Sequence, residues 1–98
     1  MRYTVILSPE PDGGYSVVCP ALPGCVSQGD GLNDALANVR EAMELWLEVA
    51  REDGEEPPAE TADVVSGEIA AILRDRAEGG LPLTIETRVV ELPEPVAA

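Results

Sequence analysis

Histidine, lysine and phenylalanine are absent from this chain of 98 residues. Histidine is the commonest general base and a frequent metal ligand in proteins, and the two cysteines do not complete a four-ligand zinc site without it. A Walker-type phosphate-binding loop also needs a lysine. We therefore expect a protein that is not an enzyme and that holds no metal and no cofactor.

Aromatic residues and long apolar runs are also scarce. With one Trp and two Tyr, the core must be built mainly from Val, Leu, Ile and Ala. The apolar segment 3–7 is too short for a secretory signal, and no run reaches the length that spans a membrane. We expect a cytoplasmic protein in which Cys19 and Cys25 are reduced and buried; a redox disulfide between them is the alternative.

Positively charged residues are also few. Six arginines stand against 19 acidic residues, which gives a formal net charge of -13. Binding to nucleic acid or to an anionic membrane needs a basic surface, so we expect neither as a direct partner. The charge fits a basic protein partner, because opposite fields favour association. It fits equally well a protein whose acidity only keeps it soluble.

The first third of the chain has the pattern of a β-meander. Residues 2–8 alternate so that Tyr3, Val5 and Leu7 share one face, which predicts a strand. Turn-forming residues at 9–14 precede a second strand at 15–19, so the two runs form a hairpin. Two prolines break the ladder at 20–24, and a short third strand follows at 25–28.

The apolar period then changes from two to 3.6 residues, which predicts an amphipathic helix over residues 32–52. Asp30 or Gly31 is its expected N-cap, and Gly54 is its expected stop signal. We expect its apolar stripe to be buried on the sheet, so that Trp46→Ala costs about 3–5 kcal/mol. The stripe comprises Leu32, Ala35, Leu36, Val39, Ala42, Met43, Trp46, Leu47 and Ala50.

The remaining residues predict a weaker second helix and a last strand. A polar, proline-containing linker covers 54–62, the helix covers about 63–77 and the strand covers 83–92. The tail 93–98 should be loose. The whole chain, 1–98, is then a single domain, in which 1–53 form the βββα core.

These elements give an α+β fold of order βββα(α)β. Three antiparallel strands form a meander, the long helix packs on one face, and the last strand lies beside the first, for which we expect a parallel pairing. Ile6, Val18 and Val26 point to the opposite face, which the second helix or a second copy of the chain would have to cover.

We therefore expect a homo-oligomer, a dimer or higher. Leu45 and Val49 lie off the helix stripe, and Ile85 and Val89 lie on the last strand, so these four are the expected oligomer or partner contacts. Scattered exposed apolar residues are also normal, which is the alternative for Leu45 and Val49.

Three segments carry a resemblance to a known family. DGGY at 12–15, CPALPGCVSQGD at 19–30 and ALANVREAMELWLE at 35–48 resemble the HicB-like antitoxin family, over more than a third of the chain. The family-motif positions are Asp12, Gly13, Tyr15, Cys19, Pro20, Leu22, Pro23, Gly24, Gln28, Gly29 and Asp30.

The resemblance implies a partial RNase H-like fold and the role of a type II antitoxin. Such a protein binds and blocks a HicA-like toxin, which is a small basic RNA-cleaving protein. HicB proteins commonly add a C-terminal DNA-binding module, but Arg74, Arg76 and Arg88 do not form a basic recognition surface. An orphan homo-oligomeric binding domain without a toxin partner is the alternative function.

A nuclease is the third interpretation, because Glu41, Glu44 and Glu48 form a row of carboxylates. A two-metal nuclease needs carboxylates that converge from several elements, and residues 2–8 contain none. We interpret the row as the solvated face of the helix.

Overall fold

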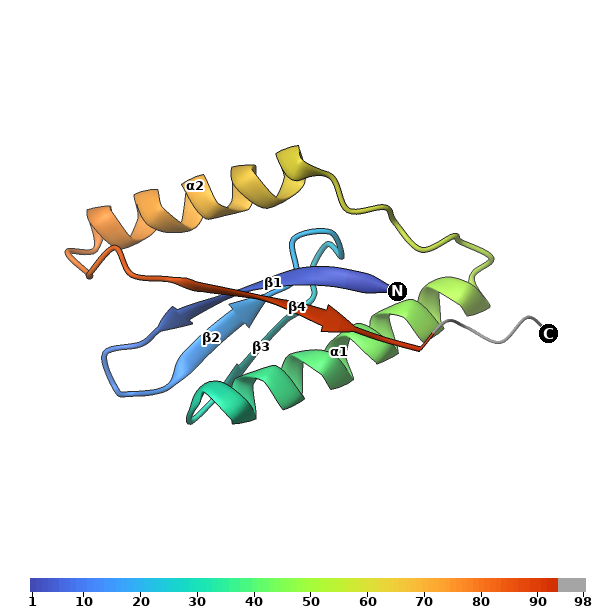
Figure 1. The fold of residues 1–98 in the computed structure, drawn as a ribbon, viewed down its shortest axis with the longest axis horizontal. Coiled ribbons are helices and arrows are strands. Elements are labelled where there is room, and N and C mark those ends of the chain that lie inside the picture. Colours follow the sequence, from blue (N-terminus) through green and yellow to red (C-terminus); the bar gives the residue numbers. More distant parts are fainter. Residues whose placement is uncertain (94–98) are drawn as a thin grey trace.

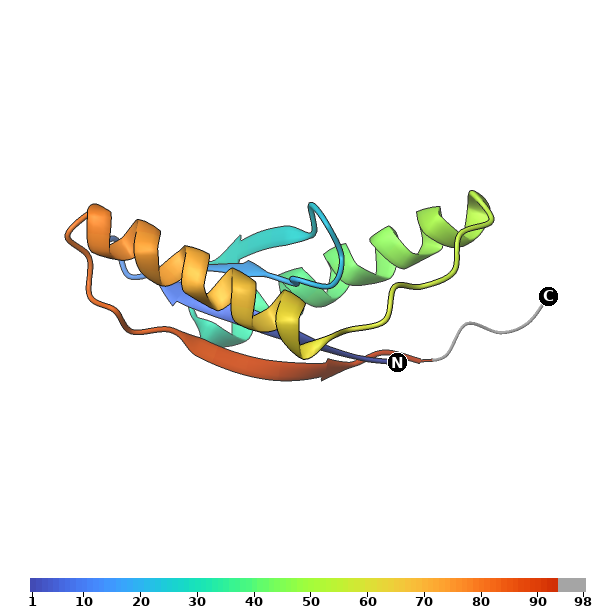
Figure 2. The same ribbon diagram turned by 90° about the horizontal axis from the view of Figure 1, so that it is seen from above.

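The computed structural model describes residues 1–93 and shows one four-stranded sheet with a helix on each face (Figures 1 and 2). Residues 94–98 of the expected loose tail lie outside the described residues. The elements are β1 (Arg2–Pro9), β2 (Tyr15–Val18), β3 (Val26–Gly29), α1 (Leu32–Glu52), α2 (Ala62–Glu78) and β4 (Glu86–Glu91). The strand order is β3-β2-β1-β4, so the predicted α+β class, the meander and the position of the last strand beside the first are confirmed.

The hairpin between β1 and β2 is built as the sequence predicts. Gly13 has a φ of 98°, which favours glycine, and the backbone N–H of Gly14 donates to the Asp12 carboxylate at 3.1 Å. β2 ends at Val18 and β3 begins at Val26, so the predicted strand ends at 19 and 25 belong to the connecting loop instead.

The direction of β4 corrects the sequence analysis. β4 pairs antiparallel with β1, with Arg2 opposite Glu91 and Ile6 opposite Thr87, whereas we expected a parallel pair. α1 runs back along the sheet after β3, and α2 then runs along it once more (Figure 1). This additional passage reverses the chain before β4 begins. β4 is also shorter than predicted, because residues 83–85 and residue 92 are not part of the strand.

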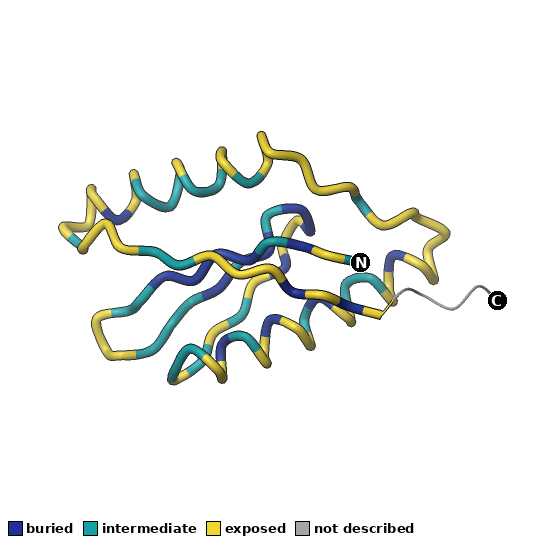
Figure 3. Tube along the Cα trace, viewed as in Figure 1, coloured by how far each residue is buried: buried dark blue, intermediate teal, exposed yellow. Residues whose placement is uncertain are grey.

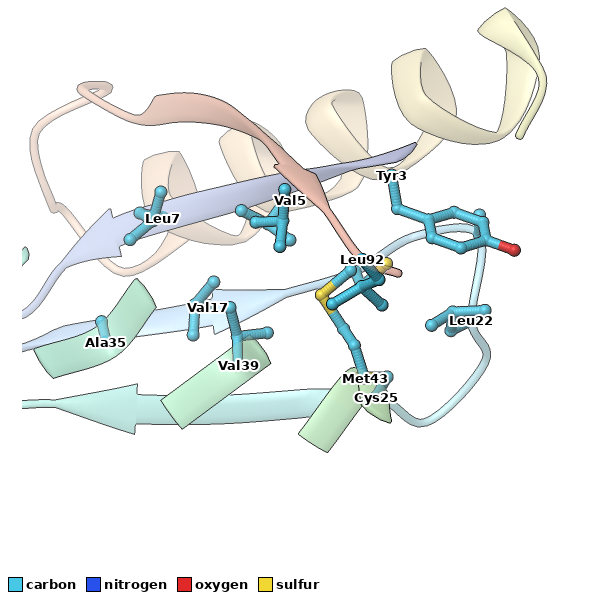
Figure 4. Close-up of a cluster of buried hydrophobic side chains, with 13 residues drawn as sticks. Tyr3, Val5, Leu7, Val17, Leu22, Cys25, Ala35, Val39, Met43 and Leu92 are labelled. Carbon is cyan, nitrogen blue, oxygen red and sulfur yellow. The ribbon is translucent and has the colours of Figure 1, made fainter. Parts of the chain in front are cut away.

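The core lies between α1 and the sheet. Figure 4 shows side chains from β1, β2, the 19–25 loop, α1 and Leu92 meeting there. The predicted stripe is only partly right. Its residues Ala35, Val39, Met43 and Ala50 are buried, whereas Leu32, Leu36 and Trp46 lie at its edges and are half-buried. α1 ends where predicted, since Gly54 adopts a φ of 77°.

α2, one of the two covers that we expected for the second sheet face, covers this face only in part. Ile6 is fully buried under α2, Val18 is half-buried and Val26 is 63 % exposed. α2 is mostly exposed or half-buried along its length (Figure 3), and the residue that it buries is Arg76. A second copy is therefore not needed to bury Ile6.

Candidate functional site

Most of the 19–25 motif serves the fold. The two cysteines are opposite each other, just after β2 ends and just before β3 begins, and the N–H of Cys19 donates to the carbonyl of Cys25 at 3.0 Å. The N–H of Leu22 donates to Cys19, and the N–H of Cys25 donates to Leu22. Leu22 is fully buried. The motif is a self-bonded loop that inserts one leucine into the core.

A hydrogen bond from a tryptophan of α1 holds the same loop against the helix. The indole N–H of Trp46 donates to the carbonyl of Pro23 at 2.9 Å. Gly24 follows with a φ of 80°, a conformation that other residues rarely adopt. Pro20 is half-buried and Pro23 is exposed, so Pro23 holds its carbonyl toward the helix while its ring meets solvent.

The two thiols are buried and unreactive by their chemistry. Both are free. Burial raises the pKa of Cys19 to about 12, with a further contribution from Cys25, and burial also raises the pKa of Cys25. A nucleophilic cysteine needs a lowered pKa, so neither thiol is suited to catalysis.

Gly29 in the motif permits a close approach of two backbones. A Cβ at this position would lie 2.3 Å from the backbone nitrogen of Ala35, in the first turn of α1. Next to it, the Asn38 side chain donates to the carbonyl of Gln28 at 2.7 Å. Gly29 and Asn38 thus form the close contact between β3 and α1.

The exposed ends of the motif line a polar hollow beside the hairpin turn. Asp12, Gly13, Tyr15, Gln28, Gly29 and Asp30 border it, together with Glu10, Asp34 and Asn38. Its carboxylates give it a negative character that suits a cationic side chain of a partner. Within residues 1–93, no group of three or more acidic, His or Cys side chains is arranged to hold a metal ion.

An exposed apolar patch lies where α1 and β3 meet. Leu45 is 61 % exposed, Val49 is 47 % exposed and Val26 of β3 is 63 % exposed. They border one groove, whose floor includes Cys25, Ala42 and Trp46 and whose rim includes Asp53 and Glu55. We call Val26, Leu45 and Val49 the α1–β3 patch.

The other two expected contacts lie at the far edge of the sheet. Val89 of β4 is 53 % exposed, and Ile85, just before β4, is half-buried. α1 packs on β3 and β2, whereas β4 is the opposite edge strand. The four residues that we grouped as contacts therefore belong to two separate surfaces.

The positions of two residues were not predicted. Val26 was expected only on the open sheet face, and its place beside α1 depends on the edge position of β3. The sequence predicted no structural role for Arg76, whose guanidinium donates to the carbonyls of Pro82 at 2.6 Å and Pro9 at 3.0 Å. The sequence did contain a signal for this position. Arg76 follows Ile69 by seven residues and Leu73 by three, and that spacing places all three on the inward face of the helix.

The carboxylate row on α1 does not converge with other acidic residues. Glu41, Glu44 and Glu48 are all exposed, and Glu44 pairs with Arg40 at 3.3 Å along the helix. No carboxylate comes from β1. None of the described helices is long and apolar enough to cross a membrane.

Comparisons with known proteins agree with this fold. The family model for the HicB-like antitoxin of bacterial toxin–antitoxin systems matches residues 3–70. A UPF0150 protein of Thermoplasma acidophilum is 39 % identical over 66 residues, which cover 67 % of this chain and 96 % of that protein.

Two solved structures share the fold. The N-terminal domain of the Burkholderia pseudomallei antitoxin HicB has a TM-score of 0.69 at 24 % identity, over 96 % of this chain and 100 % of that domain. A chain of the HicA3 and HicB3 toxin–antitoxin complex has a TM-score of 0.61 at 20 % identity, over 96 % of this chain and 100 % of the other.

Proposed function

The chain belongs to the HicB-like antitoxin family, and from this premise we propose that it is a non-catalytic cytoplasmic antitoxin. It binds and blocks a small, basic, RNA-cleaving toxin of the HicA type. A protein of the same fold occurs in a complex of HicA3 and HicB3, which supports a toxin as the partner.

The α1–β3 patch is the observation that carries this proposal. It gathers Val26, Leu45 and Val49 along one groove, whereas the other exposed large apolar residues, Val64, Leu83 and Val89, lie outside that groove. The fully buried centre of a protein interface is more apolar than its polar rim, so this patch suits the centre of an interface. Asp53 and Glu55 at the rim would meet basic residues of the partner.

The net charge of -13 acts over the whole surface. It attracts a basic protein and accelerates the encounter, while it repels nucleic acid. Arg76, one of the three arginines near the C-terminus, is buried, so it adds nothing to a nucleic-acid surface. We expect no direct binding to duplex DNA or to RNA.

The test is co-expression with a HicA-type protein encoded beside the gene of this chain. We expect the two proteins to co-purify in a fixed ratio and growth to be restored. Leu45→Asp and Val49→Asp should weaken binding at least about tenfold, since each places a charge in the apolar centre. Leu83→Asp is the matched control, because Leu83 is 60 % exposed and lies outside the patch.

Two results would contradict the proposal. The first is a toxin that neither co-purifies with this chain nor loses its toxicity. The second is binding that tolerates both patch substitutions as well as it tolerates Leu83→Asp, which would place the toxin elsewhere.

An orphan homo-oligomeric binding domain is the second candidate function. The open edge of β4 favours it, because an unpaired strand edge is a ready site for pairing with another chain. A stable oligomer that binds no HicA-type protein would support this candidate over the first.

A further inference from the structure

The groove beside the α1–β3 patch follows the last three turns of α1. The residues that α1 contributes to it recur at the spacing of one helix face. They are Ala42, Leu45, Trp46, Val49, Ala50 and Asp53. At a rise of about 1.5 Å per residue this face is about 16 Å long, so the groove can receive more than one side chain of a partner.

The wall of the groove opposite α1 is held in place by the chain itself. Trp46 lies in the floor, and its indole N–H donates to the carbonyl of Pro23 at 2.9 Å. The N–H of Cys25 donates to the carbonyl of Leu22 at 2.9 Å, and Leu22 is fully buried. Because these groups are already ordered, binding in the groove costs little additional conformational entropy.

The groove ends at an unusual helix C-terminus. The N–H of Glu55 donates to the carbonyl of Ala50 at 2.8 Å, and the N–H of Gly54 donates to the carbonyl of Arg51 at 3.0 Å. With Gly54 at a φ of 77°, these bonds form a Schellman motif. The residue at the position of Glu55 is commonly apolar in this motif and packs on the residue at the position of Ala50. Here it is a glutamate, which lines the apolar groove.

The carboxylates at this end of the groove also oppose the helix dipole. Asp53 and Glu55 both line the groove, whereas the C-terminus of a helix carries a partial negative charge that favours cations. Arg51, the basic residue of the last turn, lines a different groove together with Met1 and Leu92. Within residues 1–93, no ion pair engages Asp53 or Glu55.

Two local preferences are therefore broken at one place, where α1 ends and the groove ends. Departures of this kind are expected at functional sites. A lysine or arginine of a partner would satisfy both preferences, because its aliphatic stem can pack on Ala50 while its charge meets the two carboxylates. The net charge of -13 favours a partner that carries such residues.

We propose that the groove binds the basic toxin in one orientation. An apolar side chain of the toxin packs on Trp46 beside Leu45, and a neighbouring lysine or arginine reaches Asp53 and Glu55 at the end of α1. This inference rests on the proposed function and names the chemistry of the segment that the toxin contributes.

Removal of the two charges tests the orientation on the full chain. Asp53→Asn combined with Glu55→Gln should raise the dissociation constant of the HicA-type toxin at least about tenfold at ordinary salt. It should also make binding less sensitive to salt. Glu41→Gln combined with Glu56→Gln is the matched control, because it removes the same charge from two exposed positions outside the groove. The control should bind the toxin as the parent protein does.

Unfolding of the same variant separates binding from folding. Because the two carboxylates oppose the helix dipole, Asp53→Asn combined with Glu55→Gln should keep or raise the midpoint of urea unfolding. A purely structural role would lower this midpoint together with the affinity. A lower midpoint would therefore contradict the proposal.

Trp46 reports directly on the apolar part of the groove. It is the one tryptophan of the chain, so labelling with fluorotryptophan gives a single signal in fluorine NMR. Unlabelled toxin should shift this signal, and Leu45→Asp should remove the shift at the same toxin concentration. A complex in which the signal does not move would place the toxin elsewhere and overturn the proposal.

Failure of this proposal and failure of the antitoxin role give different results. A toxin that binds the Asp53→Asn, Glu55→Gln variant as tightly as the parent protein would overturn the orientation and leave the antitoxin role intact. A toxin that the parent protein does not bind would contradict both.

Discussion

α1 and α2 cover opposite faces of the same sheet, but they are attached to it in different ways. On the α1 face, thirteen buried apolar residues form one cluster that includes Val5, Leu7 and Met43. On the α2 face, Ile6 is the one large aliphatic side chain among residues 1–93 that is fully buried, and a groove remains between Ile72 of α2 and β2.

Polar contacts replace apolar packing on the α2 face. Near the start of α2, the Tyr3 hydroxyl donates to the carbonyl of Pro58 at 2.7 Å, and the N–H of Thr4 donates to Glu60 at 2.6 Å. At its end, Arg76 bonds to Pro9 and Pro82. The α1 face therefore supplies the stability of the fold, whereas α2 is held in position at its two ends.

The largest loss of stability is expected at Gly29, where the contact between β3 and α1 leaves no room for a side chain. Gly29→Ala should lower the free energy of unfolding by more than about 3 kcal/mol, because its Cβ meets the backbone of Ala35. Gly67→Ala in α2 is the control. No atom lies within 4 Å of its Cβ, so it should stabilise the protein by about 0.5–1 kcal/mol. Urea unfolding measures both, and equal effects would show that the two faces are not packed differently.

Truncation of core side chains compares the faces directly. Met43→Ala should cost about 3 kcal/mol, since Met43 is fully buried against the sheet. Ile72→Ala on the half-buried face of α2 should cost about 1 kcal/mol. If the loss at Ile72 equals or exceeds the loss at Met43, the α2 face is part of the main core.

Removing the polar attachment of α2 should loosen the helix more than the fold. Arg76→Gln loses the charged hydrogen bonds to two carbonyls, each of a kind worth about 1.5–3 kcal/mol when buried. We expect faster amide hydrogen exchange throughout α2 and little change in α1. Arg74→Gln, at an exposed position of the same helix, is the control. Uniform acceleration in both helices would contradict separate attachment.

The smallest effect concerns the thiols of the α1 face at high pH. Burial raises the pKa of Cys19 from 9.0 to about 12. The folded protein thus retains a proton that the unfolded chain loses, so this contribution to stability is complete below pH 9 and declines as the pH rises toward 12.

The decline should amount to about 1 kcal/mol at pH 10. It is measured as the slope of unfolding free energy against pH, and Cys19→Ala should make the slope shallower although it also lowers stability at neutral pH. An unchanged slope in the variant would mean that the Cys19 thiol does not titrate differently on folding.

The elements on the α1 side were predictable because their signals are local. The hairpin depends on Gly13 at a positive φ, and α1 follows from its apolar period and ends before Gly54. The motif positions were recognised by resemblance, but their purpose required coordinates. Only there does Gly29 meet Ala35 and does Trp46 reach the carbonyl of Pro23.

The sequence by itself determined the element order, the acidity and the family, since residue types, short-range periodicity and an uninterrupted motif express all three. The tertiary structure alone decided that β4 runs antiparallel to β1 and that α2 covers Ile6. The direction of β4 depends on how many times the chain passes along the sheet before it, and no local pattern records that number. The tertiary structure also decided that Leu45 and Val89 lie near opposite edges of the sheet, although both are exposed apolar residues.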